Sequence, residues 1–221
     1  MPFIPVYIYF VAFSFLVSIS VYHELKPSFY YLKLFPPFLF FTLAEEIAGS
    51  YLWSIGHNNL ILYNFFSTFE FCFYLWIIGL IIYSKRMKII IRISILLYFL
   101  SATINILFIQ KITSFHTVTY SIGCLLIVFF CIYYFLELFR LPKSISLINN
   151  PAFWICSGLL FFYCCGFPLY GFINYLENIS ILLIRNFDRI FTILNIFLYS
   201  LFTIAFLCFR TGKYTLSSSS A

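Results

Sequence analysis

Three glutamates stand inside long apolar stretches of the sequence, where ionisable side chains are rare: Glu45, Glu46 and Glu70. A carboxyl group in the hydrocarbon of a bilayer is costly, and such groups commonly mark proton or ion pathways. The turn expected between the two stretches is centred between His57 and Asn58, and Glu45 and Glu70 stand equally far from that centre. On antiparallel helices joined by a short turn, their carboxyls are therefore expected at equal depth, near the middle of the bilayer.

Two interpretations of these carboxyls are open. A protonated glutamate can donate a hydrogen bond to a neighbouring carbonyl and hold two helices together, and small residues nearby would let those helices approach closely. The small residues are Ala44, Ala48, Gly49 and Ser50. Three carboxyls at one level exceed what packing requires, and carboxyls that approach one another are expected to share protons. The sequence therefore favours a functional cluster that binds protons or a cation.

Further polar residues fall in the outer half of the expected helices, the half that holds the turn at His57. Helical spacing places Asn64, Ser67 and Glu70 on one helix, and Arg185, Asp188 and Asn195 along one face of another. The predicted ligand- or ion-binding residues are Glu45, Glu46, His57, Asn64, Ser67, Glu70, Asn105, Asn174, Arg185, Asp188 and Asn195. We expect them to line a polar cavity that opens outward and reaches down to the three carboxyls, with Arg185 as the nearest candidate counter-charge.

The composition identifies the elements that must position these residues. Of 221 residues, 63% are hydrophobic, 24% are aromatic and only 9% are charged, and the mean hydropathy is +1.02. Soluble domains carry about 25% charged residues, so this chain could not cover a water-facing surface of its size. The composition predicts an integral membrane protein and excludes a nucleic-acid-binding domain, although the net charge is +6.

Seven apolar stretches have about the length that a helix needs to cross roughly 30 Å of hydrocarbon. They cover residues 3–22, 34–56, 60–83, 89–110, 118–139, 152–175 and 182–209. We therefore expect an all-α membrane protein, a seven-transmembrane helix bundle formed by one domain over residues 1–210. Residues 211–221 are expected to form a flexible tail.

Basic residues predict the orientation of the bundle. If the N-terminus lies outside, ten of the 13 Lys and Arg residues fall in cytoplasmic segments, as the positive-inside rule favours. These ten are Lys26, Lys33, Lys85, Arg86, Lys88, Arg92, Arg140, Lys143, Arg210 and Lys213. The first residues carry no basic side chain, unlike a signal peptide, so we expect the first span to be retained, with the C-terminus in the cytoplasm.

Metal and cofactor sites are not expected. The seven cysteines lie within the predicted spans and form no CxxC motif, and in spans cysteine behaves as a small apolar residue. His23 is expected on the opposite side of the membrane from His57 and His116, so the three cannot share a zinc ion. A retinal protein needs a Schiff-base lysine in its last span, and no lysine lies between Lys143 and Lys213. A retinal protein is therefore excluded.

The Glu45-Glu46 pair resembles the paired glutamates of the CAAX-type intramembrane proteases. In that family an arginine follows four residues after the second glutamate, and Ser50 stands at that position here. An intramembrane hydrolase is therefore only a minor alternative, and no catalytic residue is assigned.

Two parts of the chain resemble small seven-helix integral membrane proteins that are abundant in Bacteroidota. They are the segment from Asn58 to Phe66, followed by Glu70-Phe71, and the segment from Pro151 to Gly158. The resemblance implies a location in the bacterial inner membrane and carries no activity with it.

Three functions follow as hypotheses. Proton- or cation-linked transport of a small solute would use the three glutamates directly. A receptor-like sensor would bind a small polar ligand in the outer cavity and signal through a membrane partner. A membrane accessory of a bacterial antiviral defence system would oligomerise on activation. Besides the lipid bilayer, the expected partners are thus a small polar ligand or ion, a membrane partner protein or a second copy of the chain.

Overall fold

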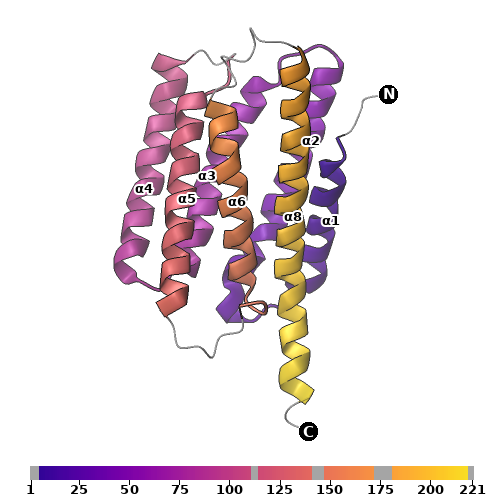
Figure 1. Cartoon of the computed structure of the whole chain (residues 1–221), viewed down its shortest axis with the longest axis vertical. Coiled ribbons are helices and arrows are strands. Elements are labelled where there is room, and N and C mark those ends of the chain that lie inside the picture. The colour runs from indigo at the N-terminus through magenta and orange to yellow at the C-terminus, as the bar shows by residue number, and fades with distance from the viewer. Residues whose placement is uncertain (1–4, 111–113, 141–146, 172–180, 219–221) are drawn as a thin grey trace.

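A computed structural model describes residues 5–110, 114–140, 147–171 and 181–218, and over these residues the chain is entirely helical (Figure 1). Seven α-helices run roughly parallel to one another as a bundle. They are α1 (Tyr7–Tyr22), α2 (Phe35–Ser54), α3 (Leu60–Ile81), α4 (Lys85–Ile104), α5 (Thr117–Arg140), α6 (Pro151–Gly171) and α8 (Ile181–Ser218). A 3-10 helix, η1 (Pro27–Leu34), precedes α2, and a π-helix, η2 (Asn105–Ile109), ends α4.

Five of the helices are long and apolar enough to cross a membrane. These segments are Leu60–Ile81, Lys85–Ile109, Thr117–Arg140, Pro151–Leu169 and Asn186–Cys208. Helix α1 is apolar but has only 16 residues, and the 20 residues of α2 include the two adjacent glutamates. The all-helical, membrane-type fold predicted from the sequence is confirmed. Helix α8 continues to Ser218, into the segment predicted as a tail.

The helices form a closed arrangement in which α2, α1, α8, α6 and α5 follow one another, each packed against the next. Helix α3 packs against α4 and α5, and α4 lies at the outer edge of the bundle (Figure 1). Only 22% of the α4 span is buried, so most of its apolar surface is available to lipid. Helices α2 and α3 are consecutive in the chain, yet they meet over a smaller area than most other neighbours.

A tight turn joins α2 to α3, as the sequence predicts. Gly56 has φ +76°, a conformation that other residues adopt only with strain. The amide of His57 donates to the carbonyl of Leu52 over 2.9 Å, and the amide of Gly56 donates to that of Trp53 over 3.1 Å. This pair of bonds is the Schellman pattern, which ends a helix abruptly. The turn thus places Glu45 and Glu70 on neighbouring antiparallel helices.

Aromatic rings fill the interior. Phe71 of α3 is fully buried among Tyr98 of α4, Tyr120 of α5 and Tyr163 of α6, with ring centroids 5.0–5.5 Å apart. Gly123 of α5 makes room for the Phe71 ring, because a Cβ at this glycine would lie 2.6 Å from ring atom Cδ1. Small residues at helix contacts of this kind are typical of membrane bundles.

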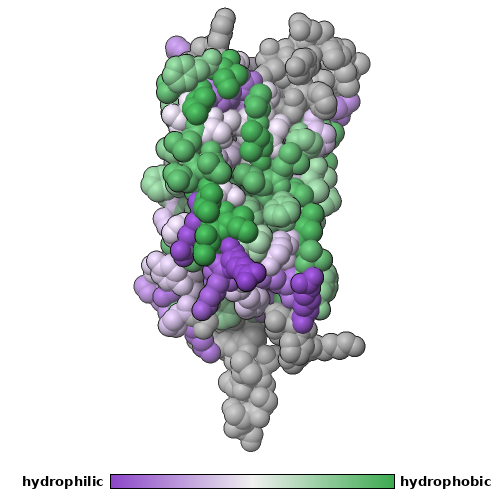
Figure 2. Space-filling view, turned by 90° about the vertical axis from the view of Figure 1, so that its left-hand side faces the viewer, coloured by the Kyte–Doolittle hydropathy of each residue, from purple (hydrophilic) through white to green (hydrophobic). Residues whose placement is uncertain are grey.

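Figure 2 shows a wide apolar band over the face that α4 forms, with hydrophilic residues gathered below it. The lower end in Figure 1 carries η1, the turn between α3 and α4, and the C-terminal end of α5. Most of the basic residues predicted to be cytoplasmic therefore share one end of the bundle, including Lys26, Lys33, Lys85 and Arg86. The α2–α3 turn lies at the opposite, upper end.

Candidate functional site

Glu45, Glu46 and Glu70 come together between α1, α2 and α3, and we call these three side chains the carboxyl cluster. Glu45 is 6% exposed and interacts electrostatically with both Glu46 and Glu70. Glu46 is half-buried and accepts a hydrogen bond from the hydroxyl of Tyr7, with an O–O distance of 2.6 Å. Glu45 and Glu70 thus influence each other electrostatically, and their equal depth in the bilayer stays a prediction.

The cluster lacks a positive counter-charge among the described residues. The charged neighbours of each glutamate are the other glutamates, and the remaining neighbours are tyrosines. Oxygen Oε1 of Glu45 has no hydrogen-bond partner in the described part of the chain. A buried polar atom without a hydrogen-bond partner is rare in proteins, and proton or ligand binding is one role that explains it.

Three buried tyrosine hydroxyls surround Glu70. They belong to Tyr74 of α3, Tyr98 of α4 and Tyr163 of α6, each at most 1% exposed and within electrostatic range of the Glu70 carboxyl. The Tyr74 hydroxyl lies closest, although no hydrogen-bond geometry joins it to Glu70. None of the three hydroxyls has a hydrogen-bond partner among the described residues. Glu70 therefore lies close to three buried tyrosine hydroxyls within an aromatic core.

Above the cluster, α2 and α3 are closed against each other. A Cβ at Gly49 would lie 2.5 Å from the Tyr63 hydroxyl oxygen, so only glycine leaves room for this ring. The side-chain amide of Asn59 donates to the carbonyl of Gly49 over 3.2 Å. Both contacts lie on the side of the α2–α3 turn. They seal the interface between the carboxyl cluster and the upper end.

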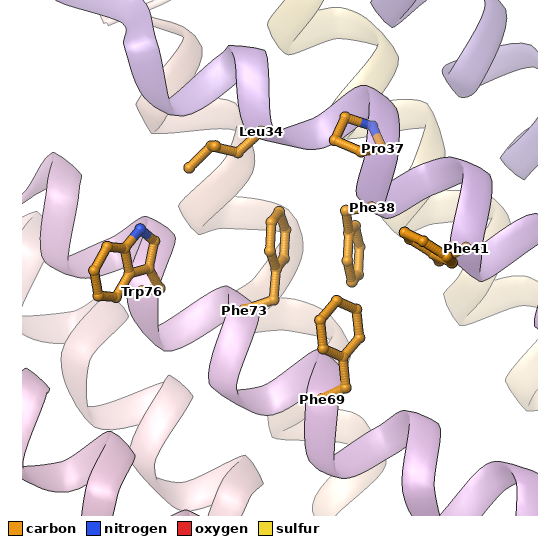
Figure 3. A pocket seen from close by; sticks show the side chains of 7 residues that line it. All are labelled: Leu34, Pro37, Phe38, Phe41, Phe69, Phe73 and Trp76. Carbon is orange, nitrogen blue, oxygen red and sulfur yellow. The ribbon is translucent and has the colours of Figure 1, made fainter.

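Below the cluster, the same two helices diverge and leave an apolar groove of about 300 Å³ (Figure 3). Seven residues line the groove: Leu34, Pro37, Phe38, Phe41, Phe69, Phe73 and Trp76. Figure 3 shows the Phe38 and Phe73 rings face to face, with centroids 3.9 Å apart and an interplanar angle of 4°. Phe41, Phe69 and Trp76 are about half exposed, at 56%, 47% and 50%. The groove is thus open to the lipid side of the bundle.

Asn64, Ser67 and Asn105 belong to a second polar group, which we call the His116 network. Ser67 lies 2.8 Å from His116 Nε2, and Thr119 lies 3.0 Å from His116 Nδ1. The Asn64 side chain accepts from the His116 amide over 3.1 Å, and Asn105 donates to Thr119 over 3.3 Å. The network joins α3 to the C-terminal end of α4 and the start of α5. Its residues are buried and mostly hydrogen-bonded to one another, as in a network that stabilises the packing of helices.

The His116 network continues through the π-helix η2. Asn105, the first residue of η2, donates to Gln110 over 2.8 Å, and Gln110 donates to Thr117 over 3.1 Å. Burial lowers the pKa of the His116 ring to about 4, because the charged form would lose its hydration. His116 is therefore neutral at physiological pH, and either ring tautomer can serve the hydroxyls on its two sides.

The remaining predicted residues lie apart from the carboxyl cluster. His57 is exposed in the α2–α3 turn, and Asp188 is exposed on α8. Asn195 donates to the carbonyl of Phe191 in its own helix over 3.0 Å. Arg185 belongs to α8, but its side chain is outside the described part, and Asn174 lies outside the described residues altogether. The outward-opening cavity and the role of Arg185 as counter-charge stay predictions.

Sequence reasoning did not find the tyrosines of the site. The chain contains 18 tyrosines, and nothing in the sequence distinguishes Tyr7, Tyr74, Tyr98 and Tyr163 from those of a membrane interface. A signal was present for Tyr74, because it follows Ser67 and Glu70 at helical spacing on the inner face of α3. Tyr7 stands near the start of the first expected span, where an interface tyrosine would also be found, yet its hydroxyl donates to Glu46.

No family model matches the chain, and neither a curated protein nor a solved structure matches it.

Proposed function

We propose that the protein crosses the bacterial inner membrane seven times, with its N-terminus outside, and binds protons at the carboxyl cluster to drive transport of a small solute. The observation that carries the proposal is the meeting of Glu45, Glu46 and Glu70 without a basic partner among the described residues. Intramembrane carboxyls of this kind mark proton relays and coupling sites in pumps and transporters.

Bound protons explain how the charges of the carboxyl cluster are neutralised better than a multivalent metal ion does. Moving an ionised carboxylate out of water costs several kcal/mol unless a counter-charge is close. Three such charges side by side would add mutual repulsion, so bound protons are the simplest neutralising species. In the described part of the chain, no group of three His, Cys, Asp or Glu residues has the geometry to hold a metal ion.

The packing around the cluster supports coupling to a conformational change. Glu46 accepts a hydrogen bond from Tyr7 of α1, whereas Glu45 on α2 and Glu70 on α3 interact electrostatically between two helices that make few contacts. A change in the charge of Glu45 or Glu70 therefore alters the interaction between α2 and α3 directly.

Infrared difference spectroscopy on the purified protein tests proton binding directly. The carbonyl stretch of a protonated carboxyl disappears when the group ionises, so a pH titration should show bands that are lost in Glu45→Gln and Glu70→Gln. Glu24→Gln is the matched control, because Glu24 lies in the turn between α1 and η1. Spectra of both cluster variants that match the unmodified protein would contradict proton binding.

Proteoliposomes test transport. A pH-sensitive dye trapped inside should report solute-dependent proton movement when a panel of sugars, amino acids and amines is supplied outside. Glu70→Gln should abolish this signal while Glu24→Gln leaves it unchanged. Titrating carboxyls without solute-dependent proton movement would favour the receptor-like sensor, and dye release on oligomerisation would favour the defence accessory.

A further inference from the structure

We propose that the carboxyl cluster and the apolar groove beneath it form one binding site for an amphipathic organic cation that enters from the bilayer. The proposal rests on the transport function above and names the substrate class. Its apolar part is the aromatic groove between α2 and α3, and its polar part is the cluster of uncompensated carboxyls.

The groove and the cluster are adjacent along both helices. Glu70 directly follows Phe69 on α3, and Glu45 lies one turn beyond Phe41 on α2. A single side chain also connects the two parts. The Tyr74 ring packs edge-to-face on Phe38 with centroids 5.2 Å apart, and the Tyr74 hydroxyl lies beside Glu70.

The closure above the cluster makes the groove the open route between α2 and α3. Tyr63 packs on Gly49 and Asn59 bonds to the same glycine, on the side of the turn. Phe41 and Trp76 are about half exposed on the opposite side of the cluster, and Phe69, level with the cluster beside Glu70, is about half exposed as well. A ligand dissolved in the acyl chains would therefore meet these three rings first.

The chemistry of the two parts defines the ligand. A volume of about 300 Å³ is at the lower limit of pockets that bind drug-sized molecules. Aromatic faces attract cations, and they also accept apolar ring systems. Oxygen Oε1 of Glu45 and the hydroxyls of Tyr74 and Tyr163, which have no hydrogen-bond partner among the described residues, can act as acceptors for a positive head group. A neutral lipid tail would fill the groove but leave these atoms unsatisfied.

Binding of the cation displaces a proton. The protonated carboxyl releases its proton, and the resulting carboxylate pairs with the cation, so the charge of the site is conserved. Protons and the cation therefore compete for one site, and this competition is what exchange of one for the other across a membrane requires.

Ethidium, a fluorescent aromatic cation, tests the site in nanodiscs of zwitterionic lipid. The protein should bind it saturably, and the neutral compound 6-phenylphenanthridine, which keeps the ring system without the charge, should bind at least about tenfold more weakly. The apparent affinity should fall as the pH is lowered, and binding in weak buffer should release protons.

Two variants separate the two parts of the site. Glu70→Gln should weaken ethidium binding at least about tenfold and abolish proton release, because a carboxylate partner is lost. Trp76→Leu should weaken ethidium binding about three- to tenfold through loss of an aromatic face. Glu24→Gln and Trp53→Leu are the matched controls, since Trp53 is 74% exposed near the upper end of α2.

Equal binding of the charged and neutral compounds would overturn the proposal, and so would unchanged ethidium binding in Glu70→Gln. If the carboxyls titrate in the infrared spectrum but ethidium does not bind, this substrate class is wrong and the proposed proton site stands. If the carboxyls do not titrate, both fail. The pH dependence of ethidium binding to the unmodified protein tests competition between protons and the cation even if a variant does not fold.

Discussion

Glu45 illustrates the conflict between stability and function at a single residue. Its carboxyl is buried, it lies within electrostatic range of two further carboxyls, and one of its oxygens has no partner in the described part of the chain. An unsatisfied buried polar atom costs about 1–3 kcal/mol. A residue that lowers stability in this way is better explained by a role in binding than by a role in helix packing.

Replacing Glu45 by leucine should therefore make the protein more stable, by about 1–3 kcal/mol, while it abolishes solute-dependent proton movement. Thermal unfolding in detergent measures the first effect and the proteoliposome assay measures the second. Glu24→Leu is the matched control and should change neither by much. A marked loss of stability in Glu45→Leu would instead support the structural hydrogen bond that the sequence left open.

His116 makes the stability of the upper end depend on pH. Burial lowers its pKa from 6.5 to about 4, so between these values the unfolded chain binds the proton that the folded protein excludes. The stabilising contribution is present above pH 6.5 and is lost as the pH falls toward 4, by at most about 3 kcal/mol.

The temperature of the unfolding midpoint should accordingly decrease as the pH is lowered from 7 to 5. His116→Gln should make this temperature depend less on pH. His57→Gln provides the control, because His57 is exposed in the α2–α3 turn. An unfolding midpoint with the same pH dependence in His116→Gln as in the unmodified protein would contradict this account.

At the scale of the elements, the fit of α3 against α5 depends on the contact between Gly123 and Phe71. Alanine at position 123 would place its Cβ 2.6 Å from the Phe71 ring. That ring also packs against Tyr98, Tyr120 and Tyr163, so it has little room to move. Overpacking of this kind costs typically about 1–3 kcal/mol, more than the gain in helix propensity.

Gly123→Ala should therefore lower the unfolding temperature, with circular dichroism in detergent as the measurement. Gly158→Ala should have a smaller effect, because its closest neighbour is the end of the flexible Leu198 side chain at 3.2 Å. The reverse order of the two effects would show that the α3–α5 contact tolerates an added methyl group.

The lengths of the apolar stretches and the turn residues between them were enough to predict the helices. Every expected span overlaps one α-helix of the structure, and the turn at Gly56 follows the end of α2. The pairing of Glu45 with Glu70 was also predictable, since a short turn fixes relative depth. The division of the polar residues into two groups was not, because the rotation of α3 about its axis sends Asn64 and Ser67 to His116 and Glu70 to the carboxyl cluster. That rotation depends on ring packing around Phe71, which helical periodicity does not encode.

At the scale of the whole molecule, the two ends of the bundle differ in charge. We expect the α2–α3 turn outside and the α3–α4 turn, with Lys85, Arg86 and Lys88, in the cytoplasm. In a variant without the native cysteines, Asn58→Cys should react in intact spheroplasts with a membrane-impermeant maleimide. Lys85→Cys should react only after permeabilisation. The opposite pattern would invert the proposed topology.

The brevity of α1 has a consequence for the surrounding lipid. Its 16 residues rise about 24 Å, whereas the hydrocarbon of a typical bilayer is about 30 Å thick. Helix α1 also starts well below the upper end of α2, its neighbour in the bundle (Figure 1). In the proposed seven-span arrangement, acyl chains next to α1 must compress or tilt to match it, because a bilayer adjusts to a short helix by such local thinning. The protein should therefore be more stable in membranes of shorter acyl chains, and the thinned lipid would lie beside the helix that holds Glu46 through Tyr7.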